Sequence, residues 1–438
     1  MEPWLFYALL SAVSAAFVSI FGKVGLQGID SNVATAVRAV IMAVFLIGVV
    51  FVQGNFSHLA DVLQDKKGLL FVALSGIAGA TSWLFYFLAL KYGPVSKVAP
   101  DKKIRQEIKA NWDRVAKPLD GLGEFEGLLA RIGAILGSPE IDIAKKAVIV
   151  MCADNGVVAE GISQSGQEIT AAVTENLGKR NTSVCKMAQT VGAEVFPVDI
   201  GVNTDRIFPG VISRKVKKGT NDFLLKPAMS EREAMQAVRV GMELVKECKE
   251  AGYTLLGTGE MGIGNTTTSA AMAAALLSVP PEIVAGRGAG LSDEGLARKR
   301  QVIAEALEKY QLRETEPMRI LCSVGGLDIA GLCGVFLGGA KYHMPIVADG
   351  VISAVAALTA ERLCPGTKEF IIPSHKGKEP ASELLMRELG LSPVLDAELA
   401  LGEGTGAVMM FSLLDIAMSL YETGATFGDF KIEEYHRF

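Results

Sequence analysis

The sequence predicts an α/β protein in which a parallel sheet is flanked by helices, preceded by three transmembrane helices. Two observations carry this prediction. Three uncharged apolar runs open the chain, each about 20 residues long and therefore long enough to cross a bilayer. From about residue 147 onward, short apolar segments alternate with glycine-containing loops and alanine-rich segments, a pattern typical of strands alternating with helices. Because parallel neighbours need a crossover helix, this alternation indicates a parallel sheet with its ligands at the carboxyl ends of the strands.

The composition limits the class of protein. With 438 residues, the chain is long enough for two or more domains with a large core. The 48 acidic residues outnumber the 43 basic ones and 7% of residues are aromatic, which argues against nucleic acid as the main partner. The six cysteines show no C-x-x-C spacing, so buried free thiols in a reducing compartment are expected. The four histidines are scattered, and no metal site is expected.

The first hundred residues are expected to lie in a membrane. The apolar runs cover residues 3–22, 39–57 and 68–90, and small residues within them suit close helix packing in lipid. A core helix of a soluble domain could explain one run, but three in succession favour membrane spans. The Met-Glu-Pro start lacks the basic residues of a signal peptide, so no cleaved leader is expected.

The run from Trp4 to Gly25 and the segment from Trp83 to Pro100 resemble the first half of an EamA-type drug/metabolite transporter domain. The similarity ends after Pro100, so residues 1–100 are expected to be a truncated transporter segment without a complete transport path. Basic residues after the third run favour a cytoplasmic exit, whereas Lys66 and Lys67 favour the opposite orientation. The protein is expected to be membrane-associated with the rest of the chain in the cytoplasm. If the segment is an accident of gene fusion, the whole protein is expected in the cytoplasm.

Residues 101–438 form the second expected domain. It begins with a charged amphipathic helix from Ile104. The strands that follow end in loops containing glycine or an acid and a glycine, and parallel strands place such loops at one edge of a sheet. The loops are therefore expected to form the binding site. Beside the strand discussed next, apolar strands are expected at residues 147–152, 194–201, 320–324 and 346–348.

The most informative stretch runs from Gly257 to Thr268. It follows an apolar run, Tyr253–Leu256, and precedes an alanine-rich run, Ser269–Leu277, which predicts a strand, a glycine turn and a helix. Glycines permit close approach of the backbone to a ligand and a helix N-terminus favours an anion, so a phosphate site is expected. No lysine follows as in a P-loop, and the G-x-G-x-x-G match lacks an acid after a following strand. A turn that only packs a helix on the sheet is the alternative.

Seven short motifs lie in order along residues 105–438: Lys117-Pro118 with Leu122-Gly123, Ala153–Val157, Gly259–Thr267, Val324–Gly326, Asp349–Ser353, Pro373–His375 and Leu401–Ala407. Together they resemble the nicotinate-nucleotide:dimethylbenzimidazole phosphoribosyltransferase family. The resemblance implies a Rossmann-like sheet with a smaller helical subdomain, a homodimer and no cofactor. It also implies a pentosyltransferase that moves phosphoribose from nicotinate mononucleotide to 5,6-dimethylbenzimidazole or a related base during assembly of the nucleotide loop of cobalamin.

The family's reaction sets a minimum chemical requirement. A nitrogen of the base attacks C1′ of the ribose, and nicotinate leaves as a neutral pyridine, so its departure needs no strong acid. The attacking ring loses an N–H proton, which requires one carboxylate base. Glu403 matches the family's general base, the alternative being a loop carboxylate that accepts backbone N–H bonds. Glu260 matches the second active-site acid, expected to hold the ribose hydroxyls or orient the base. No metal is required, because no pyrophosphate leaves.

The resemblance also assigns binding residues. Lys299 matches a lysine that reaches the phosphate, the alternative being a solvated helix charge. Ser165 and Met261 are expected walls of the flat base pocket, although Met261 could also pack in the core. The phosphate is expected to lie against Gly262, Gly264, Asn265, Thr266 and Thr267, with Gly288 and Gly290 facing it.

Three departures from the family pattern concern the base. Asn155 stands where many members have histidine, Ala400 stands where an arginine is common, and the segment 163–167 differs from versions with proline. These differences leave the preferred base open. The alternative function is a non-catalytic domain that binds nucleotide or benzimidazole and is attached to a transporter fragment. Retention of both Glu260 and Glu403 favours the enzyme.

Overall fold

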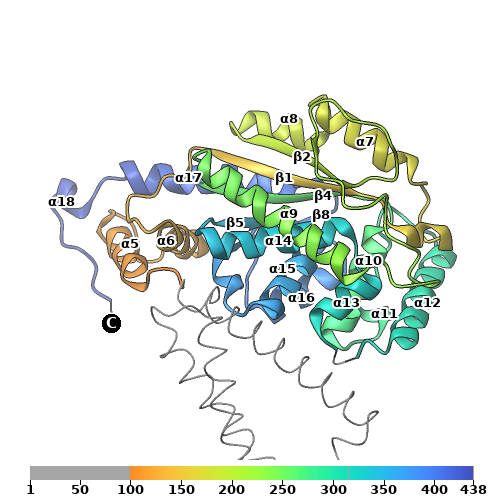
Figure 1. Ribbon diagram of the computed structural model, residues 1–438. Helices are drawn as coiled ribbons and strands as arrows, with labels where there is room; N and C mark the ends of the chain where they lie inside the picture. Colours follow the sequence, from red (N-terminus) through yellow and green to blue (C-terminus); the bar gives the residue numbers. More distant parts are fainter. Residues whose placement is uncertain (1–98, 314, 438) are drawn as a thin grey trace, which may run out of the picture. The chain divides into compact units, whose positions relative to one another are not determined.

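The computed structural model describes residues 99–313 and 315–437, which belong to a compact unit spanning Val98–Phe438. The three runs expected to cross a membrane lie outside the described residues. Among the helices that are described, none combines the length and apolar character that a bilayer crossing needs. Figure 1 shows an α/β unit with one central sheet and helices packed around it.

Six strands form the central sheet in the order β3-β2-β1-β4-β5-β6, and every neighbouring pair is parallel, which confirms the expected parallel sheet. Every residue of β1 is buried, as expected for a strand covered on both faces. The strand order reverses between β1 and β4, and open α/β sheets bind ligands at such a point. A separate sheet pairs β7 with β8. The strands are β1 Lys146–Ala153, β2 Glu194–Gly201, β3 Ile212–Ser213, β4 Leu255–Met261, β5 Ile346–Ala348, β6 Ile371–Pro373, β7 His375–Gly377 and β8 Leu395–Leu399.

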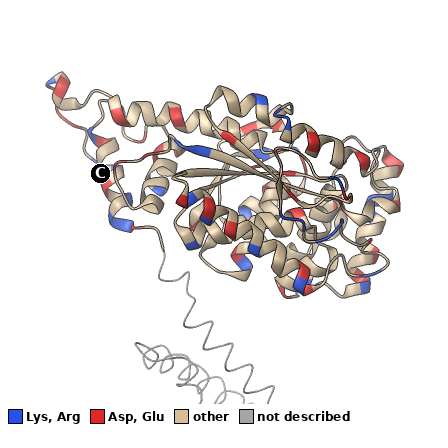
Figure 2. Cartoon of the chain, turned by 45° about the horizontal axis from the view of Figure 1, so that its top comes forward, with Lys and Arg blue, Asp and Glu red and all other residues tan. Residues whose placement is uncertain are grey.

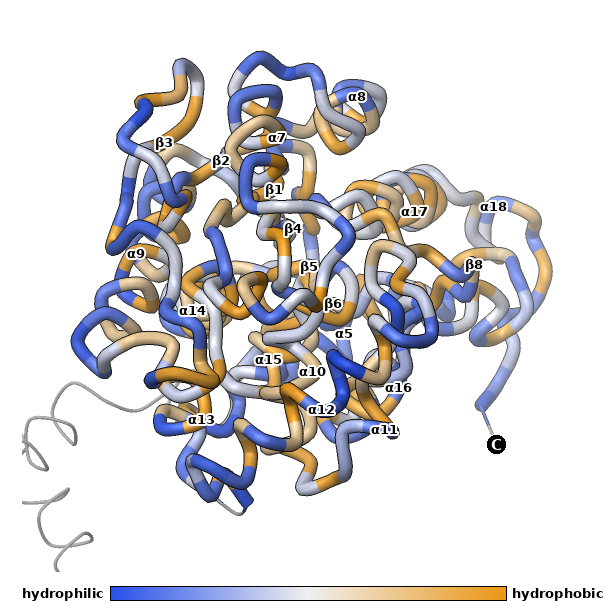
Figure 3. The backbone as a smooth tube through the Cα atoms, turned by 90° about the vertical axis from the view of Figure 1, so that its right-hand side faces the viewer, coloured by the Kyte–Doolittle hydropathy of each residue, from blue (hydrophilic) through white to orange (hydrophobic). Residues whose placement is uncertain are grey.

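Helices cover both faces of the sheet. In Figure 3 the strands form a row, with α9, α14 and α15 on one side and α7, α8 and α17 on the other. Figure 2 shows acidic and basic residues interspersed along the helices and few charges on the strands. The helices are α7 Glu168–Gly178, α8 Ser183–Thr190, α9 Glu231–Glu250, α10 Asn265–Leu277, α11 Pro281–Val284, α12 Asp293–Tyr310, α13 Pro317–Val324, α14 Leu327–Tyr342, α15 Val351–Leu363, α16 Ala381–Leu389 and α17 Thr405–Thr423, with short 3-10 turns at Gly156–Glu160 and Thr367–Phe370.

Glycines allow the closest helix packing in the core. A Cβ atom added at Gly241 of α9 would lie 2.0 Å from the carbonyl oxygen of Gly331 in α14. One added at Gly334 of α14 would lie 1.9 Å from the carbonyl oxygen of Val238 in α9. The two helix backbones therefore touch, which fixes α14 against β1, β2 and β4.

The two ends of the described chain meet in a helical layer. α5 (Lys102–Arg114), the amphipathic helix expected from Ile104, packs on α6 (Glu124–Leu136), and α6 packs on α17. Trp112 of α5 contacts Tyr421 of α17 with ring centroids 5.1 Å apart. Beyond α18 (Phe427–Phe430), Arg437 forms ion pairs with Asp113 and Asp120. The C-terminal segment is thereby tied to the first described helix.

One expected strand is wrong. Residues 320–324 form the end of helix α13, not a strand. Pro317 stands at the first helical position, where proline favours a helix start, and Ile320, Leu321 and Val324 are buried at helical spacing. A short apolar run does not distinguish a buried strand from a buried helix turn, which explains the error.

The strand before the glycine-rich stretch is longer than expected. β4 continues through Gly257, Gly259 and Glu260 to Met261, and α10 begins at Asn265 instead of Ser269. A Cβ atom at Gly257 would lie 2.9 Å from that of Ala407, and one at Gly259 would lie 2.4 Å from the carbonyl oxygen of Glu403. These two glycines therefore make room for the start of α17, and not for a ligand as the sequence suggested.

Candidate active site

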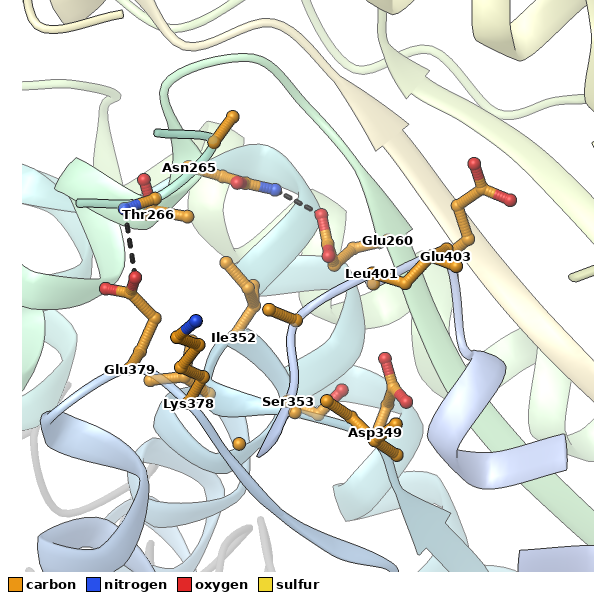
Figure 4. A pocket seen from close by; sticks show the side chains of 18 of the residues that line it. Glu260, Asn265, Thr266, Asp349, Ile352, Ser353, Lys378, Glu379, Leu401 and Glu403 are labelled. Carbon is orange, nitrogen blue, oxygen red and sulfur yellow. Dashed lines mark hydrogen bonds between the residues drawn. The ribbon is translucent and has the colours of Figure 1, made fainter. Parts of the chain in front are cut away.

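A cavity of about 230 Å³ opens at the carboxyl ends of β4 and β5 (Figure 4). Its wall is built from the end of β4, the first turn of α10, the loop after β5, the start of β7 and the loop that leads into α17. This placement agrees with the expectation that loops at the carboxyl ends of parallel strands form the site. The expected site residues that line it are Glu260, Met261, Gly262, Asn265, Thr266, Gly288 and Glu403.

A smaller cavity of about 80 Å³ adjoins the first turn of α10 and shares Gly262, Asn265 and Thr266 with the larger one. Gly264, expected at the phosphate, lines only this smaller space. Met261 lines the larger cavity and is partly exposed, so it is not a core residue. Four expected residues line neither cavity: Ser165, Thr267, Gly290 and Lys299.

The first turn of α10 offers fewer free backbone donors than expected. The N–H groups of Thr267 and Thr268 donate to the carbonyl of Gly264, and the N–H of Asn265 donates to the carbonyl of Gly262. Gly264 itself has a φ of 91°, which glycine adopts without strain. A phosphate at this end therefore depends more on side chains and on the facing glycine loop than on the helix N-terminus alone.

Lys299 places a buried positive charge beside the first turn of α10, outside both cavities, whereas Lys378 lines the larger one. The Lys299 side chain extends from α12, is 0% exposed, and donates from Nζ to Oγ1 of Thr266 at 3.0 Å. Burial lowers the pKa of Lys299 to about 8, and the carboxylate of Glu379 opposes this shift. The alternative of a solvated helix charge is therefore excluded. An anion beside Thr266 would provide the partner that a buried ammonium group requires.

The facing loop is held by the same glutamate. The N–H of Gly288 donates to Oε1 of Glu379 at 2.9 Å. A Cβ atom at Gly288 would lie 2.7 Å from Oγ1 of Thr266, so this loop and the start of α10 lie in contact. Thr266, Gly288 and Lys299 thus meet at one point, as expected. Gly290 lies outside it, and its carbonyl accepts a hydrogen bond from Gln164.

Glu260 shares an amide donor with a second buried acid. Nδ2 of Asn265 donates to Oε2 of Glu260 and, at 3.1 Å, to Oδ2 of Asp328. Burial and the charge of Asp328 raise the pKa of Glu260 to about 8, and burial raises the pKa of Asp328 to about 6. Near neutral pH, Glu260 therefore carries a proton and can donate a hydrogen bond.

Glu403 lies in a strained loop. It has a φ of 58° between Gly402 at 79° and Gly404 at 94°, so three consecutive residues adopt left-handed conformations. Oε2 accepts a hydrogen bond of 3.3 Å from the N–H of Val184 in the first turn of α8. Figure 4 shows the Glu403 side chain extending away from the carboxyl group of Glu260. Glu403 thus lines the cavity. It also accepts a backbone N–H, as expected for the alternative reading of Glu403 as a loop carboxylate.

One of the three positions that depart from the family pattern, Asn155, lies beneath the site. Asn155 is buried, and its Oδ1 accepts a hydrogen bond of 3.1 Å from Oγ1 of Thr268. Its Nδ2 has no hydrogen-bond partner among the described residues. A Cβ atom at Gly262 would lie 3.0 Å from this Nδ2. Asn155 therefore supports the turn between β4 and α10 without lining either cavity.

Sequence reasoning missed two acids. Asp349 follows β5 and accepts three N–H groups at the start of α17. Its motif was singled out without a role, although an acid directly after a buried strand was a usable signal. Asp328 could not be found in this way, because the strand expected before it is a helix. Ser165, expected at the base pocket, lines neither cavity, and its N–H bonds to Oγ of Ser163.

A cavity at the carboxyl ends of a parallel sheet, with a buried lysine beside a glycine loop, is the kind of site that suits a phosphate-bearing ligand. Residues 98–432 match the Phosphoribosyltransferase family, and the chain belongs to that family. The nicotinate-nucleotide–dimethylbenzimidazole phosphoribosyltransferase of Acetivibrio thermocellus is 45% identical over 328 residues, which cover 75% of this chain and 93% of that protein. The enzyme of the same name from Clostridium acetobutylicum is 43% identical over 335 residues, covering 76% of this chain and 95% of that protein.

Solved structures agree with these relatives. The crystal structure of CobT from Thermus thermophilus has a TM-score of 0.72 and 37% identity, covering 76% of this chain and 99% of that one. The family resemblance drawn from the motifs is thereby confirmed. Residues 2–100 match the EamA-like transporter family, which agrees with the second resemblance.

Proposed function

We propose that this chain transfers phosphoribose from nicotinate mononucleotide to 5,6-dimethylbenzimidazole or a related base, giving α-ribazole 5′-phosphate and nicotinate for the nucleotide loop of cobalamin. The names of relatives matched over nearly their whole length support this activity. One structural observation carries it: a single cavity has two glutamates at one end and a glycine loop beside a buried lysine at the other.

The anion end binds the nucleotide phosphate. Lys299 provides the charge through its contact with Thr266, and the N–H of Gly288 provides a backbone donor once Glu379 releases it. Gly262, Gly264, Asn265, Thr267 and Gly290 shape the surrounding turns. Charge-assisted hydrogen bonds of this kind are stronger than neutral ones, so the phosphate anchors the substrate. The ribose then extends toward Glu260, whose carboxyl group donates a hydrogen bond to a ribose hydroxyl.

The glutamate end performs the chemistry. A nitrogen of the base forms a bond to C1′ while the C1′ bond to the pyridine nitrogen of nicotinate breaks, and its electron pair returns to that ring. The proton lost from the other nitrogen of the base passes to the carboxylate of Glu403. The N–H of Val184 holds one oxygen of this carboxylate, and the other accepts the proton. Met261 and Leu401 provide apolar walls for the flat ring.

Nicotinate release by the full chain tests the activity. Glu403→Gln should abolish turnover while nicotinate mononucleotide still binds, because only the proton acceptor is lost. Glu398→Gln provides a matched control, since Glu398 is exposed on nearby β8. Full turnover by Glu403→Gln would place the base elsewhere. No nicotinate release with any benzimidazole or purine base would favour the alternative, a domain that only binds nucleotide or base.

The N-terminal segment is proposed to tether the catalytic domain to a membrane, with that domain in the cytoplasm as part of a homodimer. The match of residues 2–100 to the EamA-like transporter family supports a membrane segment. The alternative is a segment that contributes nothing to activity or location.

A further inference from the structure

Asp349 occupies a position from which it controls the start of α17. It follows β5 directly and is 3% exposed. Its Oδ1 accepts the N–H groups of Gly406 at 2.8 Å and Ala407 at 3.2 Å, and its Oδ2 accepts the N–H of Gly404 at 3.2 Å. The residue at the N-cap of α17 is Gly404, which has no side chain to cap the helix. A carboxylate 55 residues earlier in the chain therefore caps it instead.

The residue that precedes this cap is Glu403. A left-handed conformation is unfavourable for a residue with a Cβ atom, and it persists only where the surroundings impose it. The hydrogen bond to Asp349 fixes the following N–H, at Gly404, and the carbonyl of Glu403 lies against Gly259. The backbone of Glu403 is thus held between a buried carboxylate and a strand.

We propose that Asp349 is the residue that positions Glu403 for proton abstraction, by fixing the backbone on which Glu403 is carried. The inference rests on the proposed function, in which Glu403 is the base. Asp349 acts through the first turn of α17 and needs no contact with the base itself. Thr258 in turn positions Asp349, because its Oγ1 accepts the N–H of Asp349 at 3.1 Å.

The test compares Asp349→Asn with Asp415→Asn in the full chain. An asparagine keeps the shape of Asp349 but turns one acceptor into a donor that faces an N–H group. Asp415 lies on the same helix and pairs with Lys146 at 2.5 Å, so its substitution removes a charge without touching the first turn. Asp349→Asn should lower kcat by about 10- to 100-fold, the loss expected when a reacting group moves by about 1 Å. KM for nicotinate mononucleotide should change by less than about twofold, and Asp415→Asn should leave both near the unmodified values.

Asp349→Ser keeps one acceptor and should give an intermediate kcat. A kcat of Asp349→Asn equal to that of the unmodified chain, or a loss confined to KM, would overturn the inference. So would failure of both Asp349 variants to fold, because Asp349 would then serve the fold as a whole. The variant Glu403→Gln distinguishes failure of the positioning role of Asp349 from failure of the proposed base, Glu403. If it is inactive while Asp349→Asn is fully active, only the positioning role fails; if it is active, the proposed base fails first.

Discussion

A half-buried glutamate and a buried aspartate share one amide at the end of β4, and this arrangement determines the charge of the site. Nδ2 of Asn265 contacts both Glu260 and Asp328, and no ion pair among the described residues neutralises either carboxyl group. Removing two carboxylates from water without a cation is costly, so one proton is retained. The site therefore presents a neutral donor at Glu260.

The raised pKa of Glu260, about 8, predicts how stability depends on pH. Between the pKa of the unfolded state, about 4.3, and about 8, the unfolded chain is ionised at this position while the folded chain is protonated, so the group destabilises the fold progressively as pH rises. The substitution Glu260→Gln removes this pH-dependent destabilisation. Its unfolding free energy relative to the unmodified chain should rise by about 1–2 kcal/mol from pH 5 to pH 8, after allowing for water in the cavity.

Thermal or urea unfolding at both pH values measures the difference. Asp328→Asn removes the neighbouring charge and lowers the pKa of Glu260, so the pH effect of a second Glu260→Gln substitution should shrink in that background. A Glu260→Gln difference that is the same at pH 5 and pH 8 would show that Glu260 ionises normally.

Because Lys299 is buried, its substitution is expected to have opposite effects on stability and on nucleotide binding. Its charged form is disfavoured by burial, and the cost is present below the folded pKa of about 8 and declines as pH rises toward the unfolded value of about 10.4. Lys299→Met should therefore raise the unfolding free energy at pH 7 by about 1–3 kcal/mol. It should also weaken binding of nicotinate mononucleotide by about 10- to 100-fold, the value of a charged hydrogen bond.

Calorimetry of binding and urea unfolding measure both effects. Lys309→Met, on the exposed side of the same helix, provides the control and should leave nucleotide affinity unchanged. Equal affinity of Lys299→Met and the unmodified chain would place the phosphate away from Lys299.

At the scale of elements, β4 and α17 form one unit. Gly257 and Gly259 lie within the strand, and the first turn of α17 rests on them. The expected phosphate turn thus begins only at Gly262, and the earlier glycines of the stretch serve the contact between a strand and a helix. This contact brings Glu403 to the same cavity as Glu260.

Gly259→Ala tests this contact. The added Cβ atom would lie 2.4 Å from the carbonyl oxygen of Glu403, so strand and loop must separate. We expect a loss of about 1–3 kcal/mol in the unfolding free energy and a fall of at least about tenfold in kcat. Gly127→Ala is a suitable control, because a Cβ atom there has no neighbour within 4 Å and alanine favours the helix α6. Normal activity in Gly259→Ala would show that Glu403 tolerates displacement.

At the scale of the whole molecule, activity is predicted to reside in residues 99–438. The relatives match this part over 93% and 95% of their own lengths, so the segment matched to the transporter family has no counterpart in them. Removal of residues 1–98 should leave kcat within about twofold, as for a domain with its own core. The same removal should move the protein from the membrane to the soluble fraction. Unchanged fractionation would show that residues 1–98 do not tether the chain.

The parallel sheet and the family were predictable because motif order and strand–loop alternation are properties of the sequence itself. The boundary of β4 was not predictable. The glycines in this strand are explained only by their contact with the start of α17, some 150 residues later in the chain. The same holds for Asp349, whose role depends on N–H groups far along the chain. The burial of Lys299 depends on how α12 packs against α10, so the sequence alone could not show whether this side chain is buried or solvated.

The contact between Gly259 and Glu403 also limits how base selectivity can change. Glu260 adjoins Gly259 in the strand, so a shift of the loop before α17 would displace both acids relative to each other and impair turnover. Selectivity can therefore change freely only at cavity-lining side chains that we propose as walls for the base, such as Leu401 and Met261. Laboratory evolution toward a purine acceptor should accumulate point substitutions at such positions and reject insertions or deletions between Leu399 and Gly404.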